Sequence, residues 1–376
     1  MNLVIAGDFC PNYRTQKMLS QKDFSNIISN EAKFFFKKAD IAILNLECPI
    51  INEEVDSIDK VGPSIKGDLK SLDFLKYLGV DAVTLSNNHI MDFGAKGLES
   101  TINGCSAYSI RSFGAGMNIE QARTPLVIKS DKQNVAIINM SENEFATTHG
   151  KNPGANPLDL VNNYHDIVDA KKNNDYVIVI YHGGHEGYKY PSPRMKKVFR
   201  YFVDVGADLV VCHHSHCYSG HEIYNNKNIF YGLGNFIFDW PGYHKKPWNY
   251  GYFLHVDTMS NNITIHPYIQ SSENPTLRLL ENQEKTNFLE DLTKINVVIK
   301  DDTELLEKFD QLVLERERSY LSLLQPYPGY LLAGAYRRGV LPNLLNKNKA
   351  LRYLNAFRCE AHRDLQIKSI EKNLLL

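Results

Sequence analysis

Short apolar segments alternate with amphipathic segments along residues 3–212, and this alternation constrains the fold more than any other feature of the chain. The strand-like segments are "LVIA" (3–6), "IAIL" (41–44), "VDAVTL" (80–85), "YVIVIY" (176–181) and "DLVVC" (208–212). The segments with helical spacing of apolar residues include 24–39, 69–79, 95–107, 160–172 and 194–205. Alternating strands and helices predict an α/β fold with parallel strands.

The pattern changes after residue 218, where strand-like segments are separated by turns. Asn225-Asn226 and Asn261-Asn262 lie between such segments, and paired asparagines suit the tight turns of hairpins. Strand–helix units followed by hairpins predict two sheets packed face to face, with helices outside.

Beyond about residue 280 the strand-like segments stop. Residues 301–324 have helical spacing of apolar residues, and residues 346–376 have the pattern of another helix. The polar stretch "SSENPT" (271–276) precedes this region. We therefore expect a first domain over 1–275 and a helical C-terminal appendage over 280–376.

The composition excludes some classes of partner. The chain has 376 residues, and its 42 basic and 43 acidic residues leave a net charge of -1, which favours neither nucleic acid nor an anionic membrane as a partner. "MNLVIAGD" is too short for the apolar core of a signal peptide, and no stretch approaches the roughly 18 apolar residues of a membrane span. We expect a cytoplasmic protein with reduced cysteines.

Polar residues follow each of the five strand-like segments. In chain order they are Asp8, then Asn45 and Glu47, then Asn87, Asn88, His89 and Asp92, then His182, His185 and Glu186, then His213, His214 and His216. Because the carboxyl ends of parallel strands share one edge of a sheet, where ligands bind, these side chains should converge.

The residue types suggest a metal centre. Carboxylates, a carboxamide and several imidazoles form a mixed oxygen and nitrogen set that suits two divalent cations such as Mn²⁺, Fe²⁺ or Zn²⁺. His214 and His216 are two residues apart, so a turn can aim both rings at one region. Glu47 is placed to bridge the pair. Two such cations activate water and assist displacement at phosphorus.

Each residue also has a simpler interpretation when it is taken alone. Asp8 is typical of a turn or a helix cap, and His89 of a cap. The cluster of His213, His214 and His216 is compatible with a surface loop. The coincidence at five strand ends favours the metal centre over these alternatives.

Several motifs resemble those of a known family in their order and spacing. They are "GD" (7–8), "NLE" (45–47), "NNHIMDFG" (87–94), "HGGHE" (182–186), "HHSH" (213–216) and "YGLGNFIFD" (231–239). The chain resembles the CapA family of capsule and poly-γ-glutamate biosynthesis proteins over residues 1–270. That family belongs to the calcineurin-like metallophosphoesterase superfamily, which implies a four-layer α/β/β/α sandwich with two metal ions.

The resemblance implies a role for individual residues. The implied metal ligands are Asp8, Glu47 and His216 at one ion and Asn88, His182 and His214 at the other, with Glu47 bridging. His89 would act beside the phosphate as proton donor or charge stabiliser, and Asp92 would orient it. Cys10 stands where the superfamily often has histidine, and it is either a further ligand or a bystander.

Substrate contacts are predicted less sharply. The candidates are Asn45, Glu186, Arg194 and Asn235, with Arg194 as a phosphate clamp. The segment "DWPGYHKKPWNYGY" (239–252) contains Trp240, Tyr243, Lys245, Lys246 and Trp248. It has two interpretations: its rings stack on a sugar or base while its lysines meet phosphate, or it is an ordinary surface loop.

We therefore expect a two-metal hydrolase that cleaves a small-molecule or polymer-linked phosphomonoester or phosphodiester. One alternative is a non-hydrolytic accessory protein of poly-γ-glutamate or capsule polymer biosynthesis. Another is a metal-dependent amidohydrolase. The natural substrate, the metals and the oligomeric state stay open at this stage.

Overall fold

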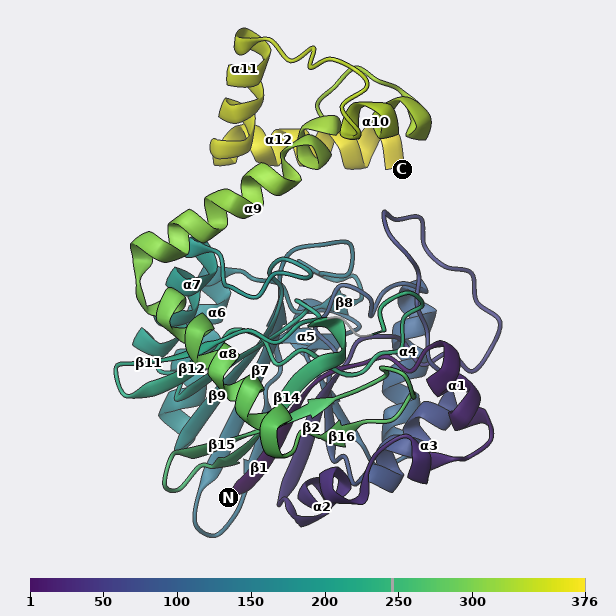
Figure 1. Ribbon diagram of the computed structural model, residues 1–376, viewed down its shortest axis with the longest axis vertical. Coiled ribbons are helices and arrows are strands. Elements are labelled where there is room, and N and C mark those ends of the chain that lie inside the picture. The colour runs from purple at the N-terminus through teal and green to yellow at the C-terminus, as the bar shows by residue number, and fades with distance from the viewer. Residues whose placement is uncertain (245–246, 376) are drawn as a thin grey trace. The chain divides into compact units, whose positions relative to one another are not determined.

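The computed structural model describes residues 1–244 and 247–375 (Figure 1). The chain divides into two compact units, Met1–Leu306 and Glu307–Leu376. The first unit contains two large mixed sheets and helices, and the second unit is helical.

The first sheet has the strand order β16-β15-β14-β1-β2-β3-β4, and β13 also pairs with β1. The strands are β1 (Asn2–Phe9), β2 (Ile41–Leu46), β3 (Ala82–Thr84), β4 (Arg111–Phe113), β13 (Asn235–Ile237), β14 (Tyr250–Asp257), β15 (Asn262–Ile269) and β16 (Arg278–Leu279). Strands β1 to β4 are parallel, and β14 joins β1 in antiparallel register.

The second sheet has the order β11-β12-β10-β9-β7-β6. Its strands are β6 (Leu126–Lys129), β7 (Asn134–Ser141), β9 (Tyr176–His182), β10 (Leu209–His213), β11 (His221–Tyr224) and β12 (Lys227–Phe230). The four central strands are parallel, and the hairpins β6–β7 and β11–β12 form its edges. A small pair, β5 (Ala115–Gly116) and β8 (Gly154–Ala155), lies apart from both sheets.

Helices cover the outer faces of the sheets. They are α1 (Tyr13–Ser20), α2 (Asn30–Lys38), α3 (Leu69–Leu78), α4 (Gly94–Ala107), α5 (Ile119–Arg123), α6 (Leu160–Asn173), α7 (Pro193–Asp204) and α8 (Asn282–Lys300). Leu3 and Ile5 of β1 belong to a buried cluster with residues of β7, β9 and β10. Val4 and Ala6 alternate with them and pack with α2, α3 and α4. The expected layers of helix, sheet, sheet and helix are confirmed.

Helix ends follow local chemistry. Helix α3 begins after Asp68, whose carboxylate accepts a hydrogen bond from the Lys70 amide, and it ends at Gly79 with a φ of 94°. Helix α2 begins only at Asn30, because the Ser29 hydroxyl caps it. The predicted helix over 24–39 is therefore shorter at its start, where a separate 3-10 turn spans Phe24–Asn26.

The division into units differs from the expected boundary at 275–280. Helix α8 belongs to the first unit, because its Phe288, Leu292 and Ile295 are buried in the cluster between β-sheet and helices. The Phe288 ring lies 4.4 Å from that of Tyr218. The amphipathic pattern of α8 thus serves the sandwich itself.

The C-terminal helices are α9 (Asp302–Ser322), α10 (Gly329–Arg337), α11 (Lys347–Arg358) and α12 (Glu360–Ile370). The predicted helix over 301–324 corresponds to α9, whereas the predicted helix over 346–376 is interrupted at Cys359 between α11 and α12. Among the described residues, no helix has both the length and the apolar content needed to cross a membrane.

Candidate metal centre

Four parallel strands bring polar side chains to one place. Asp8 lies near the end of β1, Glu47 directly after β2, and His182 at the end of β9; His214 and His216 follow β10. We call the set Asp8, Glu47, Asn88, His182, His214 and His216 the polar centre. The predicted convergence of strand ends is observed, and it joins residues from both sheets.

The turn after β10 is strained in a way that serves this convergence. His214 has a φ of 89° and His216 a φ of 53°, which lie in the left-handed region that side chains other than glycine rarely adopt. Such conformations cost about 1–3 kcal/mol each and concentrate at functional sites. They turn both rings toward the strand ends of the other sheet.

The motif glycine before Asp8 also has a structural reason. A Cβ atom on Gly7 would lie 1.8 Å from the carbonyl oxygen of Gly234. Only glycine therefore lets β1 approach the segment before β13, where the Asp8 amide donates a hydrogen bond to Gly234. The "GD" and "LGNF" motifs meet at this crossing.

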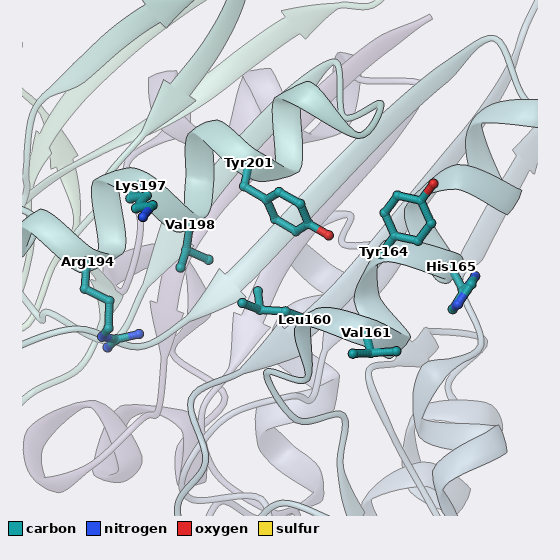
Figure 2. Close-up of a pocket in the computed structure, with 8 residues that line it drawn as sticks. All are labelled: Leu160, Val161, Tyr164, His165, Arg194, Lys197, Val198 and Tyr201. Carbon is teal, nitrogen blue, oxygen red and sulfur yellow. The ribbon is translucent and has the colours of Figure 1, made fainter. Parts of the chain in front are cut away.

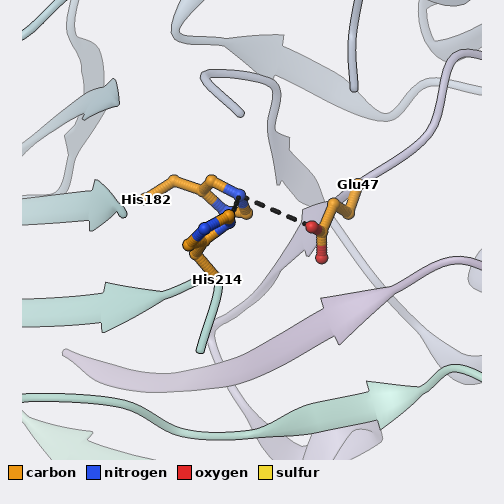
Figure 3. A group of neighbouring side chains, drawn as sticks. All are labelled: Glu47, His182 and His214. Carbon is orange, nitrogen blue, oxygen red and sulfur yellow. Dashed lines mark hydrogen bonds and ion pairs between the residues drawn. The ribbon is translucent and has the colours of Figure 1, made fainter. Parts of the chain in front are cut away.

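One group of donors surrounds His182 (Figure 3). Its Nε2 lies 3.0 Å from Asn88 Oδ1, 3.1 Å from His214 Nδ1 and 3.5 Å from Glu47 Oε1. Figure 3 shows the rings of His182 and His214 and the carboxylate of Glu47 pointing toward one another from separate elements. All three side chains of this figure are buried.

A second group consists of Asp8, Glu47 and His216. His216 Nε2 lies 3.6 Å from Glu47 Oε1, and His216 Nδ1 lies 3.7 Å from Asp8 Oδ2. In each group the donor atoms lie within 4.8 Å of one another. Glu47 belongs to both groups, so the two share one carboxylate.

The donor atoms fit divalent cations. Donors that each lie about 2.0–2.2 Å from one cation are themselves separated by roughly 3–3.6 Å, which matches most of the spacings above. Both carboxylate oxygens of Glu47 are buried, and within the described part of the chain neither has a hydrogen-bond partner. A buried carboxylate without donors is costly, and a cation would compensate it. These buried groups are able to bind metal.

The electrostatics agree with this chemistry. Burial raises the pKa of Asp8 to about 7 and holds that of Glu47 well above its ordinary range. Burial lowers the pKa of His214 to about 4 and that of His216 to about 3. The imidazoles are therefore neutral, which is the form that binds metal.

Two asparagines support the polar centre. Asn45 Nδ2 donates a hydrogen bond to Asp8 Oδ1 at 2.8 Å, and Thr84 donates to Asn45 Oδ1 at 3.1 Å. Asn235 Oδ1 lies 2.9 Å from His216 Nδ1. Asn45 and Asn235, both predicted to contact substrate, are fully buried, and they hold Asp8 and His216 in position. Their contact with substrate stays a prediction.

His89 and Asp92 form a separate group. His89 Nδ1 lies 2.8 Å from Asp92 Oδ2, which also accepts a hydrogen bond from the Ile65 amide. Lys60 forms an ion pair with Asp92 through its other oxygen, and its Nζ lies 3.2 Å from His89 Nδ1. Sequence reasoning missed Lys60, because it lies in a loop without a recognisable motif.

The remaining candidates lie outside the polar centre. Cys10 is in neither donor group, and burial holds the pKa of its thiol well above the ordinary value. Glu186 is exposed. Arg194 is bound to Glu142, which accepts a hydrogen bond from the Gly184 amide at 2.7 Å.

Arg194 also lines a groove between α6 and α7 (Figure 2). The groove has a volume of about 660 Å³, and its other lining residues are Leu160, Val161, Tyr164, His165, Lys197, Val198 and Tyr201. None of the polar-centre residues is among them. The groove is thus distinct from the polar centre.

The sequence identifies the family. A family model described as "Bacterial capsule synthesis protein PGA_cap" matches residues 2–240. The chain belongs to the PGA_cap family. The matched span contains every residue of the polar centre, together with His89 and Asp92.

Two curated relatives have similar sequences. The chain is 28% identical over 247 residues to "Capsule biosynthesis protein CapA" of Bacillus anthracis, which covers 64% of this chain and 60% of that protein. It is 29% identical over 240 residues to "PGA biosynthesis protein CapA" of Bacillus subtilis, covering 62% of each. The match thus spans about three fifths of the length of these PGA_cap relatives.

A structural comparison gives a more distant similarity. A crystal structure described as a novel phosphatase from Mycoplasma pneumoniae aligns with 76% of this chain and 96% of its own length. The identity is 15% and the TM-score is 0.45. Membership of the PGA_cap family rests on the sequence matches.

Proposed function

We propose that this PGA_cap protein is a metal-dependent hydrolase that cleaves a phosphomonoester or phosphodiester. The observation that carries the proposal is the pair of donor groups that share the buried carboxylate of Glu47, which accepts no hydrogen bond within the described part of the chain. Asp8, Glu47 and His216 would hold one divalent cation. Glu47, Asn88, His182 and His214 would hold the other. Mn²⁺, Fe²⁺ and Zn²⁺ all suit this donor set.

Two divalent cations, when bound, would lower the pKa of a water and offset charge on the phosphoryl oxygens. The chain's own residues would do the rest. His89 would pass a proton from Nε2 to the leaving oxygen when both ring nitrogens carry one, since Asp92 engages Nδ1 and so orients the ring. Lys60 offsets the charge of Asp92. Asn45 and Asn235 keep Asp8 and His216 in place.

The names of the PGA_cap relatives favour a setting for this reaction. Both contain the words capsule biosynthesis or PGA biosynthesis. We therefore propose capsule or exopolymer metabolism as the setting, with a small-molecule or polymer-linked substrate. The second candidate function is that of an accessory protein in the same process, with the polar centre binding an anionic polymer without cleaving it.

The test combines metal content with turnover. Wild-type protein purified without chelator should contain about two transition metals per chain and hydrolyse an aryl phosphomonoester or phosphodiester. Asp8→Asn should lose metal and turnover together. His89→Gln should retain metal and lose turnover by about 10²–10⁴-fold.

Asp208→Asn is the matched control. Asp208 is also a buried carboxylate, but it precedes β10 at the opposite end of that strand and pairs with Lys171 and Lys227. This variant should keep metal and turnover. Protein without transition metal after reconstitution would contradict the proposal. Metal without turnover of phosphoesters, but with cleavage of a γ-glutamyl amide, would favour an amidohydrolase, and polymer binding without any cleavage would favour the accessory role.

A further inference from the structure

A row of aromatic rings begins at the polar centre and leads away from it. The Trp248 ring lies 4.6 Å from the His216 ring, and the Tyr243 ring lies 4.9 Å from that of Trp248. Phe238 also adjoins His216 at 5.2 Å, and Trp240 lies 6.1 Å from Phe238. We call Phe238, Trp240, Tyr243 and Trp248 the aromatic wall.

The aromatic wall is held in place by polar contacts at its base. Trp248 Nε1 donates a hydrogen bond to the carbonyl oxygen of Phe238 at 2.9 Å. The Trp248 carbonyl oxygen accepts from Asn235 and from Gln270. Asp239 receives two hydrogen bonds of 2.8 Å from the Arg14 guanidinium. The wall is therefore preorganised, and the buried carboxylate of Asp239 between two of its members is compensated.

The wall leaves aromatic surface in contact with water. Tyr243 is 42% exposed, and Trp240 and Trp248 are each partly exposed. The Trp248 and Tyr243 planes meet at 54°, so the two rings are tilted and not stacked in parallel. Partly exposed aromatic rings favour a partner with a flat π-face. Lys245 and Lys246, which the stacking interpretation of this segment assigned to phosphate, lie outside the described residues.

We propose that the aromatic wall binds a planar ring in the alcohol part of the substrate, while the phosphoryl group lies at the polar centre. The proposal rests on the proposed function and deepens it. The preferred substrates are phosphoesters of nucleoside or aryl type rather than alkyl phosphoesters. His216 belongs to the polar centre and also contacts the wall, so a substrate spanning both would pass this residue.

The test uses a property of the sequence. The chain has two tryptophans, Trp240 and Trp248, and both are in the aromatic wall. Stopped-flow tryptophan fluorescence of the metal-loaded full-length chain therefore reports binding at the wall before any turnover. The probes are adenosine 5′-monophosphate and ribose 5-phosphate, which differ by the base. We expect quenching by the nucleotide, and binding at least about fivefold tighter than that of ribose 5-phosphate.

The variants separate the wall from the rest of the surface. Tyr243→Ala and Trp240→Ala should each weaken nucleotide binding by about fivefold or more and leave ribose 5-phosphate binding unchanged, as measured by calorimetry. Tyr164→Ala is the matched control, because Tyr164 is 41% exposed and lies in the α6–α7 groove (Figure 2). It should bind both probes as the wild type does. If Trp240→Ala does not fold, Tyr243→Ala alone tests whether the aromatic wall binds the nucleotide.

Three outcomes would overturn the proposal. They are equal affinity for the two probes, nucleotide binding that Tyr243→Ala leaves unchanged, and equal loss with Tyr164→Ala. Tight binding of ribose 5-phosphate that depends on Tyr243 would instead assign the wall to sugars. Failure of the proposed function looks different: the nucleotide binds at the wall, but no phosphoester is cleaved.

Discussion

The sandwich and the C-terminal helical unit differ in how completely they bury the apolar side chains of their regular elements. In the sandwich, the apolar residues of β1, β9 and β10 are almost completely buried. In the helical unit, residues 307–375 as the structure describes them, Leu331 is 83% exposed and Leu323 is 81% exposed. Both units expose some large apolar side chains, such as Val61 in the sandwich at 84%. The exceptions of interest are the buried polar groups of the polar centre and the exposed leucines of the helical unit.

The two kinds of exception differ in what they reveal. A buried carboxylate such as Glu47 requires a compensating partner of definite charge, so it points to a cation. An exposed leucine such as Leu331 costs less and is compatible with many environments. A buried polar side chain therefore indicates which kind of ligand it binds, whereas an exposed apolar side chain does not identify a partner.

The largest expected contrast concerns packing. Ile178→Ala, in the interior of β9, should lower the free energy of unfolding by about 2–5 kcal/mol, because it leaves a cavity in the fully buried cluster. Leu331→Ala on α10 should change it by less than about 0.5 kcal/mol. Denaturant unfolding measures both. Equal losses would mean that Leu331 is covered in solution and would break the comparison.

Metal binding should stabilise the sandwich selectively. A divalent cation at about 100 times its dissociation constant should add about 2.7 kcal/mol to the free energy of unfolding. Hydrogen exchange should slow in β1, β9 and β10 and stay unchanged in α10 to α12. Asp8→Asn should show neither effect. Stabilisation by metal that persists in Asp8→Asn would place the metal elsewhere.

Removal of the buried acid at Glu47 should stabilise the metal-free protein. Glu47→Gln replaces a carboxylate whose pKa is held well above its ordinary range by burial with a neutral group of similar shape. In the presence of chelator, the free energy of unfolding of the variant should exceed that of the wild type by about 1–3 kcal/mol. Its unfolding temperature should be correspondingly higher. It should also lose the stabilisation by metal. A destabilised metal-free variant would show that Glu47 has a structural partner.

The last expected effect is a change in the pH dependence of stability. Burial lowers the pKa of His213 from 6.5 to about 3, so His213 stabilises the metal-free fold above pH 6.5 and this contribution is lost as the pH falls toward 3. Asp8, with its pKa raised from 3.8 to about 7, acts in the opposite sense and loses its contribution as the pH rises through 7. His213→Leu should therefore flatten the fall in stability between about pH 6 and pH 4, by about 1.4 kcal/mol per pH unit. Chelator-treated protein unfolded by urea at several pH values measures this. An unchanged slope would mean that His213 is protonated in the fold.

Much of the candidate site followed from strand order. Asp8, Glu47 and His182 each end or follow a buried parallel strand, and parallel strands place their carboxyl ends at one edge. The contact between His89 and Asp92 was expected from the resemblance to the CapA family, and the structure contains it. The convergence of the strand ends needs only local periodicity and one topological rule.

Other features depended on long-range packing. Lys60 reaches Asp92 from a loop, and Trp248 meets His216 across a separate loop. Asn45 and Asn235 are fully buried and contact Asp8 and His216 from other strands or turns. No local pattern encodes these contacts, because each joins segments that are separated in the sequence.

The sequence by itself determined the class of fold, the edge at which chemistry collects and the kinds of ligand gathered there. These follow from the period of apolar residues and from the donor chemistry of Asp, Glu, Asn and His. Only the tertiary structure decided that Glu47 is shared between two donor groups without accepting a hydrogen bond from the described residues, and that aromatic rings adjoin one of these groups. The physical reason is that burial and distance between side chains from different strands depend on how two sheets pack, which short-range sequence patterns do not specify.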